Sequence, residues 1–334
     1  MEATQSLLGP VLTPGTTTAS QVDSAFHKLM RHRNRPLLAL YYPVGSRVSE
    51  DDAKDIYDSF RQSRVTVEKP LPALDVLVDS YGGDPVAAYR IAQLIRDFTK
   101  KVSFLVAHHA YSAATLLCFS GEEVRLAHYA GLSPIDITLV SDSGIRPSRE
   151  VELASVDSFL EFATNARKRI EELLEKMGHE SVSSVDSDLL VQMVKEVGAL
   201  EVGRYFRART LTGHYAEQLL RKYMFADHLD AKDKSEKVFN NFLFKAPTHD
   251  FHLDYHLCEA WGVSVREMDT EESDLAKSAI DTLEGLADSK VICPHLSRRT
   301  RIPFIRFYKR TNAKNTKPAN GGRKHENHHS QQRR

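Results

Sequence analysis

Two short turns in this sequence carry residues that could act on a carbonyl group. Gly82-Gly83 lies between a predicted strand and a predicted helix. Missing side chains there let a substrate approach and let backbone amides face a developing negative charge. Ser112 heads a second helix directly after a strand, which would expose its hydroxyl and direct the helix dipole toward it. Each turn alone favours a plainer interpretation, a tight turn or a helix N-cap, and only the pair together points to serine chemistry.

Patterns typical of other chemistries are missing or incomplete. The sequence has neither the GxGxxG of a dinucleotide site nor the GxSxG of a nucleophile elbow. His252 and His256 are four residues apart and could share a helix face as metal ligands, yet no HExxH glutamate stands between them. Because His and Asp also gather on solvated surfaces, we expect no metal and no cofactor. His249, beside them, is by itself better explained as a polar residue capping the turn after Pro247 than as a group that transfers a proton.

The composition is that of a folded globular protein. The chain has 334 residues, of which 41% are hydrophobic and 27% charged. Its three cysteines form no CxxC pair and cannot make a disulfide framework, which indicates a reducing compartment. We see no apolar run long enough for a membrane span and no signal-like N-terminus, so we expect a cytoplasmic protein.

Strand and helix patterns alternate through the first part of the chain and predict an α/β fold. A largely parallel sheet with crossover helices follows from this alternation, and both motif turns then fall at the carboxyl ends of strands. After about residue 150 the pattern changes to long amphipathic helices. The predicted strands are 37–42, 73–79, 102–107, 123–127 and 137–140.

The chain divides into three parts by composition and pattern. The C-terminal part holds eight Lys and Arg against one Glu and almost no apolar residues, so we expect a disordered basic tail that could contact an acidic partner or nucleic acid weakly. The predicted parts are an N-terminal helical extension, 1–34, a domain, 35–308, with its core at 35–145 and a helical elaboration at 146–308, and the tail, 309–334.

Four blocks in chain order resemble the serine dehydrogenase proteinase family, which is related to the Clp protease subunit, signal peptide peptidase A and the crotonases. The resemblance is good over 70–140 and patchy over 246–268. It implies a Clp/crotonase-like core, a peptide or protein substrate, and a homo-oligomer that is a trimer or larger. The blocks are Asp79-Ser80-Tyr81-Gly82-Gly83, Ala110-Tyr111-Ser112-Ala113-Ala114-Thr115, Leu132-Ser133-Pro134-Ile135-Asp136 and Thr248-His249-Asp250-Phe251.

The resemblance also implies the site residues of a serine peptidase. Ser112 is the implied nucleophile, His249 the general base, and Asp136 the carboxylate that orients the imidazole. The backbone amides of Gly83 and Ala113 are the implied oxyanion hole. From their places next to these residues in the sequence, we expect Gly82, His109 and Tyr111 to bind substrate.

Departures from the family pattern keep three alternatives open. Tyr81 stands where the family usually has Pro, and Ala113-Ala114 stands where a Gly usually follows the nucleophile. Lys168 could serve as the base of a Ser-Lys dyad, although its neighbours form a charged helix face that would leave it solvated. A crotonase-type acyl-CoA enzyme would use the glycine turn without a serine, and an interaction protein would keep the fold without catalysis.

Overall fold

The computed structural model describes most of the predicted core and part of the second half. Three of the sequence predictions, for Asp136, for Lys168 and for the basic tail 309–334, lie outside the described residues. The described residues are 18–135, 138–140, 150–152, 199–285, 291–295 and 306–307.

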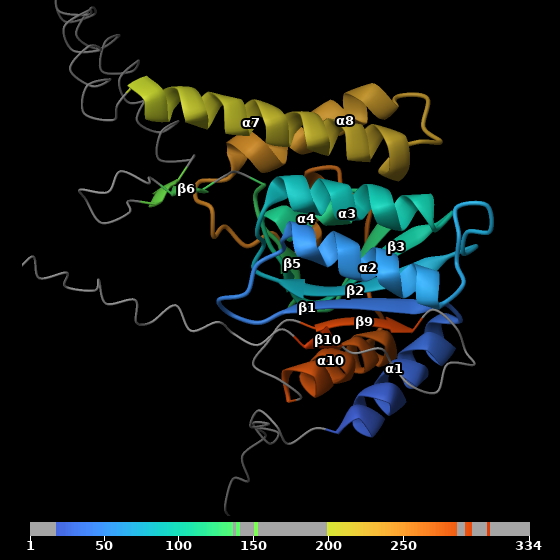
Figure 1. Ribbon diagram of the computed structural model, residues 1–334. Coiled ribbons are helices and arrows are strands. Elements are labelled where there is room, and N and C mark those ends of the chain that lie inside the picture. The colour runs from blue at the N-terminus through green and yellow to red at the C-terminus, as the bar shows by residue number, and fades with distance from the viewer. Residues whose placement is uncertain are drawn as a thin grey trace, which may run out of the picture.

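A mostly parallel sheet forms the centre of the molecule (Figure 1). Its strand order is β10-β9-β1-β2-β3-β4-β8, and β5 pairs with β3. All neighbours from β1 to β8 are parallel, whereas β9 and β10 are antiparallel additions beside β1. The strands are β1 (Leu37–Tyr42), β2 (Leu74–Ser80), β3 (Val102–Ala110), β4 (Glu123–Leu126), β5 (Gly131–Leu132), β8 (Val265–Glu267), β9 (Val291–His295) and β10 (Arg306–Phe307), and β6 (Thr138–Val140) and β7 (Glu150–Glu152) form a separate antiparallel pair.

Helices cover both faces of this sheet (Figure 1). One face carries α2, α3 and α4, with α7 and α8 stacked above them, and the other face carries α1 and α10. The α/β fold with crossover helices predicted from the sequence is therefore confirmed. The helices are α1 (Ala19–Arg33), α2 (Glu50–Gln62), α3 (Pro85–Asp97), α4 (Ala113–Cys118), α7 (Ala199–Leu219), α8 (Ala231–Asn240), α9 (Tyr255–Ala260) and α10 (Thr270–Glu284), with π-helical turns η1 (Leu220–Met224) and η2 (Asn241–Lys245).

Local sequence explains why these elements begin where they do. β1 and β2 are buried along their whole length, as expected for parallel strands covered on both faces. The carboxylate of Asp52 accepts a hydrogen bond from the Ser49 amide at 2.8 Å and starts α2. Asp84 accepts from the Val86 amide at 2.8 Å and starts α3, with Pro85 in the first turn.

The third strand is longer than its sequence pattern predicted. It runs from Val102 to Ala110, so His108 and His109 belong to the strand and not to a turn after it. The extra length is stabilised by β5, because His109 and Ala110 pair with Gly131 and Leu132. The sheet also takes β8, β9 and β10 from beyond the core predicted at 35–145, since their partners β4 and β1 expose pairing edges.

At the amino ends of the parallel strands, charged side chains form a buried network that joins α1 and α10 to the sheet. Arg33 donates to Asp75 at 2.8 Å, and Asp75 is 1% exposed. Arg125 donates to Glu272, also 1% exposed, at 2.7 Å through its Nε. Arg33 lies 3.3 Å from the same Glu272, so one acid of α10 holds a strand and a helix together.

The upper helical layer is fixed to α3 by aromatic contacts. Tyr89 of α3 stacks on Tyr215 of α7 with ring centroids 4.1 Å apart, and its hydroxyl donates to Gln218. These contacts place the middle of α7 over the carboxyl edge of the sheet (Figure 1). Within the described ranges, no helix is long and apolar enough to cross a membrane.

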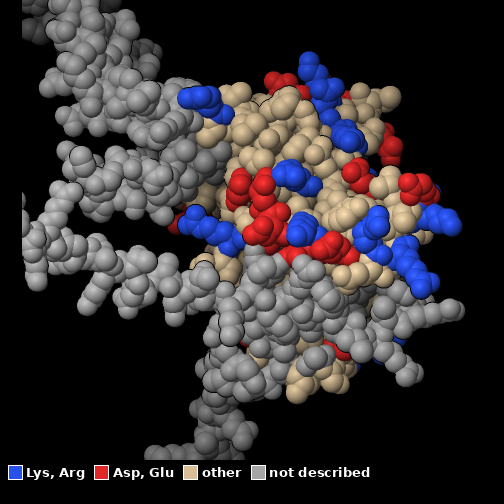
Figure 2. Space-filling view, in the orientation of Figure 1, with Lys and Arg blue, Asp and Glu red and all other residues tan. Residues whose placement is uncertain are grey.

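Charge on the visible face is mixed. Figure 2 shows basic and acidic side chains interspersed over the α2 and α3 side of the molecule. One exposed pair there joins Arg90 to Glu50. The described part of this face shows no broad patch of a single sign that would favour nucleic acid.

Candidate active site

The two motif turns meet at the carboxyl edge of the sheet. A Cβ placed on Gly82 would lie 2.8 Å from Cβ of Ser112 and 3.3 Å from the amide nitrogen of Ala113. Such distances are too short for any side chain, and Gly82 also has a φ of 104°. A glycine is therefore required at position 82 for the two turns to touch.

Ser112 occupies a strained corner between β3 and α4. Its backbone has φ 52° and ψ −116°, a conformation that a non-glycine residue adopts at a cost of about 1–3 kcal/mol. The residue stands at the N-cap position of α4, yet its hydroxyl makes no capping hydrogen bond. The plain N-cap interpretation of this serine is therefore wrong.

Buried hydroxyl groups support the strained corner from behind. The Ser112 amide donates to Oγ of Ser133 at 2.7 Å. The Ser133 amide donates in turn to Oγ1 of Thr115 at 3.1 Å, and that hydroxyl donates to the carbonyl of Ala110 at 2.6 Å. This chain of hydrogen bonds links β3, α4 and the segment after β5, and it holds the backbone of Ser112 in place.

The glycine turn is clamped by the loop after β1. Val48 donates its amide to the carbonyl of Gly82 at 2.9 Å, and its carbonyl accepts from the Asp84 amide at 3.0 Å. A Cβ on Gly83 would lie 2.4 Å from backbone atoms of Val48. Among the described residues, the amides of Gly83 and Ala113 donate to no protein acceptor, so both remain available to a ligand.

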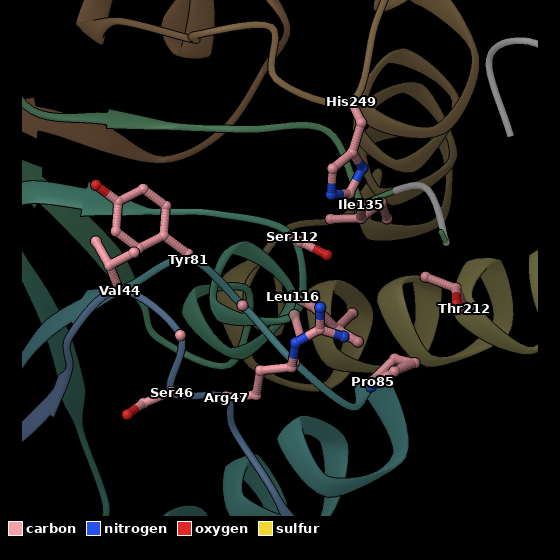
Figure 3. Close-up of a pocket in the computed structure, with 14 residues that line it drawn as sticks. Val44, Ser46, Arg47, Tyr81, Pro85, Ser112, Leu116, Ile135, Thr212 and His249 are labelled. Atoms are coloured by element: carbon pink, nitrogen blue, oxygen red, sulfur yellow. The ribbon is translucent and has the colours of Figure 1, made fainter. Parts of the chain in front are cut away.

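Ser112 opens onto a cavity of about 370 Å³. Figure 3 shows the imidazole of His249 pointing into this cavity toward Ser112, with Ile135 beside it. His249 belongs to the segment after η2, so residues 137 positions apart in the sequence line one space. The cavity is lined by Val44, Gly45, Ser46, Arg47, Tyr81, Gly82, Gly83, Pro85, Ser112, Ala113, Leu116, Ile135, Thr212 and His249.

Behind the glycine turn, a buried carboxylate lies between two histidines. Oδ2 of Asp79 accepts from Nδ1 of His108 at 3.1 Å, and this hydrogen bond raises the pKa of His108. Oδ1 of Asp79 is 3.1 Å from Nδ1 of His109, without the geometry of a hydrogen bond. Burial lowers the pKa of His109, because the charged ring would lose its hydration. His108 is therefore the more basic of the two imidazoles.

Two predicted substrate-binding residues lie behind the cavity wall. Tyr81 forms that wall, and its ring packs on His109 with centroids 4.0 Å apart. Tyr111 hydrogen-bonds to Nδ1 of His252 at 2.9 Å. Of the three predicted positions, only Gly82 lines the cavity. His109 and Tyr111 do not line it but pack against Tyr81, which does. Their role in substrate binding stays a prediction.

The histidine-rich segment does not gather as a metal site in the described ranges. There, no group of three or more His, Cys, Asp or Glu side chains lies close enough to hold an ion. His252 is instead bonded to Tyr111 and packs closely against Gly131. The buried thiols of Cys118 and Cys258 have a raised pKa because burial disfavours the thiolate, so they are poor nucleophiles.

Three polar residues of the cavity, Ser46, Arg47 and Thr212, were missed by the sequence interpretation. Arg47 lies in the loop between β1 and α2, and Thr212 lies in the middle of α7. Arg47 follows a turn that contains Gly45 just after β1, a turn that the sequence interpretation did not single out, whereas no local pattern distinguishes Thr212 from an ordinary helix residue. Only the packing of the loop and of α7 over the turns brings them to the cavity.

Comparison with known proteins gives distant similarities. No family model matches the chain. Two uncharacterized proteins of Methanocaldococcus jannaschii, MJ1495 and MJ0137, are 26% and 25% identical over 107 residues, 32% of this chain. The matched segment spans about a third of each relative, 35% and 36%.

Solved structures with a similar arrangement include two proteases. One is a serine-to-alanine variant of the membrane-bound stomatin-specific protease 1510-N, with 12% identity and a TM-score of 0.37, covering 70% of this chain and 79% of that one. The other is ClpP1 from Listeria monocytogenes, with 11% identity and a TM-score of 0.36, covering 72% of this chain and 95% of that one. Because these sequence identities are low, the function of the chain has to be inferred from its own residues.

Proposed function

We propose that this protein is a serine peptidase whose nucleophile is Ser112. The observation that carries the proposal is the strained backbone of Ser112, which is held by hydrogen bonds. The Ser112 hydroxyl makes no capping hydrogen bond and faces a cavity that His249 also lines. A strain that the surrounding hydrogen bonds maintain is typical of a functional residue. A serine needed only for helix capping would use its hydroxyl for that bond.

His249 is the proposed general base. Serine is a weak nucleophile until a neighbouring imidazole can take its proton near neutral pH. In this mechanism the Ser112 oxygen attacks the peptide carbonyl while its proton passes to His249. The imidazolium then gives that proton to the leaving amine, which breaks the C–N bond and leaves an acyl-enzyme. In the second step, water attacks the acyl-enzyme while His249 takes a proton from it. His249 then returns a proton to Ser112, which releases the acid product.

The tetrahedral intermediate requires donors for its oxyanion, and we assign these to the amides of Gly83 and Ala113. Both amides lie beside Ser112 and neither donates to another described residue. Loss of one such donor typically costs about 2.7–4 kcal/mol of transition-state stabilisation. Asp136 is the proposed partner that orients His249, and the expected homo-oligomer of three or more copies also belongs to this proposal.

Covalent labelling tests the nucleophile directly. A fluorophosphonate probe should modify the full-length protein at Ser112, as read by mass spectrometry of the peptide that carries it. Ser112→Ala should abolish labelling and lower the hydrolysis of a casein substrate about a thousandfold or more. Ser46→Ala is the matched control, because Ser46 lines the same cavity in an ordinary loop and should label like the wild type.

The same assay separates the bases and the alternatives. His249→Ala should slow labelling strongly, whereas Lys168→Ala and His252→Ala should leave it close to the wild-type rate. Unchanged labelling of Ser112→Ala would contradict the proposal. A protein that neither labels nor hydrolyses, with its thermal unfolding intact, would instead be the interaction protein.

A further inference from the structure

Arg47 lies next to Val48, whose backbone is hydrogen-bonded to the proposed oxyanion turn. Residues 43–46 form a tight turn in which the Ser46 amide donates to the carbonyl of Pro43 at 2.8 Å. Val48, directly after Arg47, is held on both sides by Gly82 and Asp84. The start of the Arg47 side chain therefore has a defined position relative to Ser112.

The guanidinium of Arg47 extends into the cavity (Figure 3). It lies on the side of Pro85 and Leu116 and faces the space in front of Ser112. The residues that line the cavity include no Asp or Glu, and Arg47 has no ion-pair partner among the described residues. Asp84 caps α3 by accepting from Val86 at Oδ1, and among the described residues it forms no ion pair with Arg47.

Thr212 supplies a second unused donor on the opposite wall. Its side chain is 1% exposed, and its Oγ1 has no hydrogen-bond partner within the described residues. Figure 3 shows the Thr212 side chain on α7, where it lines the cavity across from Arg47. A buried polar group without a partner destabilises the protein, and a ligand that accepts its hydrogen bond would remove this cost.

We infer that Arg47 and Thr212 bind a carboxylate of the substrate, so that the preferred peptides are acidic next to the cleaved bond. The inference rests on the proposed function for its peptide substrate. A guanidinium recognises a carboxylate through charge and a planar fork of donors, and a hydroxyl can add a third hydrogen bond. A neutral amide of the same shape would lack the charge and would place its own donors against the guanidinium.

Two kinds of peptide carboxylate could supply this group. One is the side chain of Asp or Glu within the peptide, and the other is a free C-terminal carboxylate. Both present the same chemistry to Arg47 and Thr212. The distinction has to come from peptides that carry only one of the two.

Binding to an inactive variant tests the inference without depending on catalysis. Fluorescein-labelled decapeptides, bound to Ser112→Ala and followed by anisotropy, would carry one Glu or one Gln at each position in turn, with a C-terminal acid or amide. We expect the peptide with a correctly placed carboxylate to bind about tenfold more tightly than its neutral match. Adding Arg47→Gln should remove this preference, and Arg47→Lys should keep part of it.

A near-isosteric change tests the second donor. Thr212→Val removes the hydroxyl at nearly constant volume and should weaken only the acidic peptide, by about fivefold. Arg61→Gln is the matched control, because Arg61 is exposed on α2 away from the cavity, and it should keep the preference unchanged. Preference for the Glu peptide assigns the side-chain carboxylate, and preference for the free acid assigns the C-terminus.

Opposite outcomes would overturn the inference. If Ser112→Ala bound acidic and neutral peptides equally, or if an acidic preference survived the addition of Arg47→Gln, these residues would not recognise a carboxylate. Failure of Ser112 labelling is a separate result, because anisotropy does not use the nucleophile. A carboxylate preference that disappears with Arg47→Gln would then identify a binding site in a protein that is not a peptidase.

Discussion

At the amino ends of the parallel strands, charged side chains are paired with one another inside the protein. Glu272 receives both Arg125 and Arg33, and Asp75 receives Arg33 and Arg35. At the carboxyl ends of the same strands, the turns hold a strained serine and amides that donate to no described residue. The buried acids at the amino ends are thus bonded by arginines, whereas the proposed oxyanion amides at the carboxyl ends have no described acceptor.

Single buried atoms without a hydrogen-bond partner occur at both ends. Near the carboxyl ends these are Oγ1 of Thr212 and Nε2 of His109, and near the amino ends Nε of Arg96 and Oγ1 of Thr99, all among the described residues. The acids of the amino-end network are bonded at both carboxylate oxygens. The two ends therefore differ in the strained serine and the glycine turn, and not in whether buried atoms lack partners.

The largest expected effect on stability comes from breaking the amino-end network. Glu272→Ala leaves Arg125 and Arg33 without their shared buried acid, and should lower the free energy of unfolding by about 3–5 kcal/mol. Urea denaturation measures this loss. The rate of Ser112 labelling per folded molecule should stay the same, because the network lies at the opposite end of the strands.

Glu271→Ala is the control for this change. Glu271 is the preceding residue of α10 and its side chain is 76% exposed. Its removal should change the free energy of unfolding by less than about 1 kcal/mol. An equal loss of stability in the two variants would mean that any substitution in this turn of α10 destabilises the protein, and that the buried ion network adds nothing.

At the carboxyl end we expect a smaller loss of stability together with slower labelling of Ser112. Ser133→Ala removes the acceptor of the Ser112 amide and should lower stability by about 1–3 kcal/mol. It should also slow fluorophosphonate labelling at least about tenfold, because the corner that presents the nucleophile is no longer held. Labelling kinetics and urea denaturation on the same preparation measure both quantities.

Ser120→Ala separates stability from function in this test. Ser120 is fully buried at the other end of α4, and its hydroxyl donates to the carbonyl of Leu117 at 2.8 Å. Its replacement should lower stability without slowing the labelling of Ser112. If both variants slowed labelling equally, Ser133 would have no positioning role.

The smallest effect concerns pH. The hydrogen bond to Asp79 raises the pKa of His108 in the folded protein above the unfolded value of about 6.5. Its stabilising contribution is therefore complete below that pH and is lost as pH rises through the raised pKa. The stability difference between wild type and His108→Gln should be greater at pH 5.5 than at pH 8.5, by less than about 1 kcal/mol.

His128→Gln provides the reference for this pH dependence. His128 is 74% exposed and contacts Glu267 on the surface. Its substitution should leave the difference between the two pH values near zero. A His108 variant that behaved in the same way would show that the buried Asp79 does not hold the proton on His108.

The sequence by itself determined the alternation of strands and helices and the place of both motif turns. Strand 37–42 and the helices starting after Ser49 and Asp84 follow from apolar runs and cap residues, which act over a few positions. Local sequence also indicated Ser112 and the Gly82-Gly83 turn as chemically suited residues. The extra length of β3 escaped prediction, because β5 pairs with it only in the folded chain.

Tertiary structure alone decided what surrounds the nucleophile. The strained backbone of Ser112 depends on Ser133, 21 positions away, and the cavity wall depends on a loop before α2 and the middle of α7. The local sequence does not show that Arg47 and Thr212 line the cavity, because that position depends on how distant segments pack. Spacing along a chain reports local structure, whereas a site is assembled by packing between distant segments, and that packing is set by the whole core.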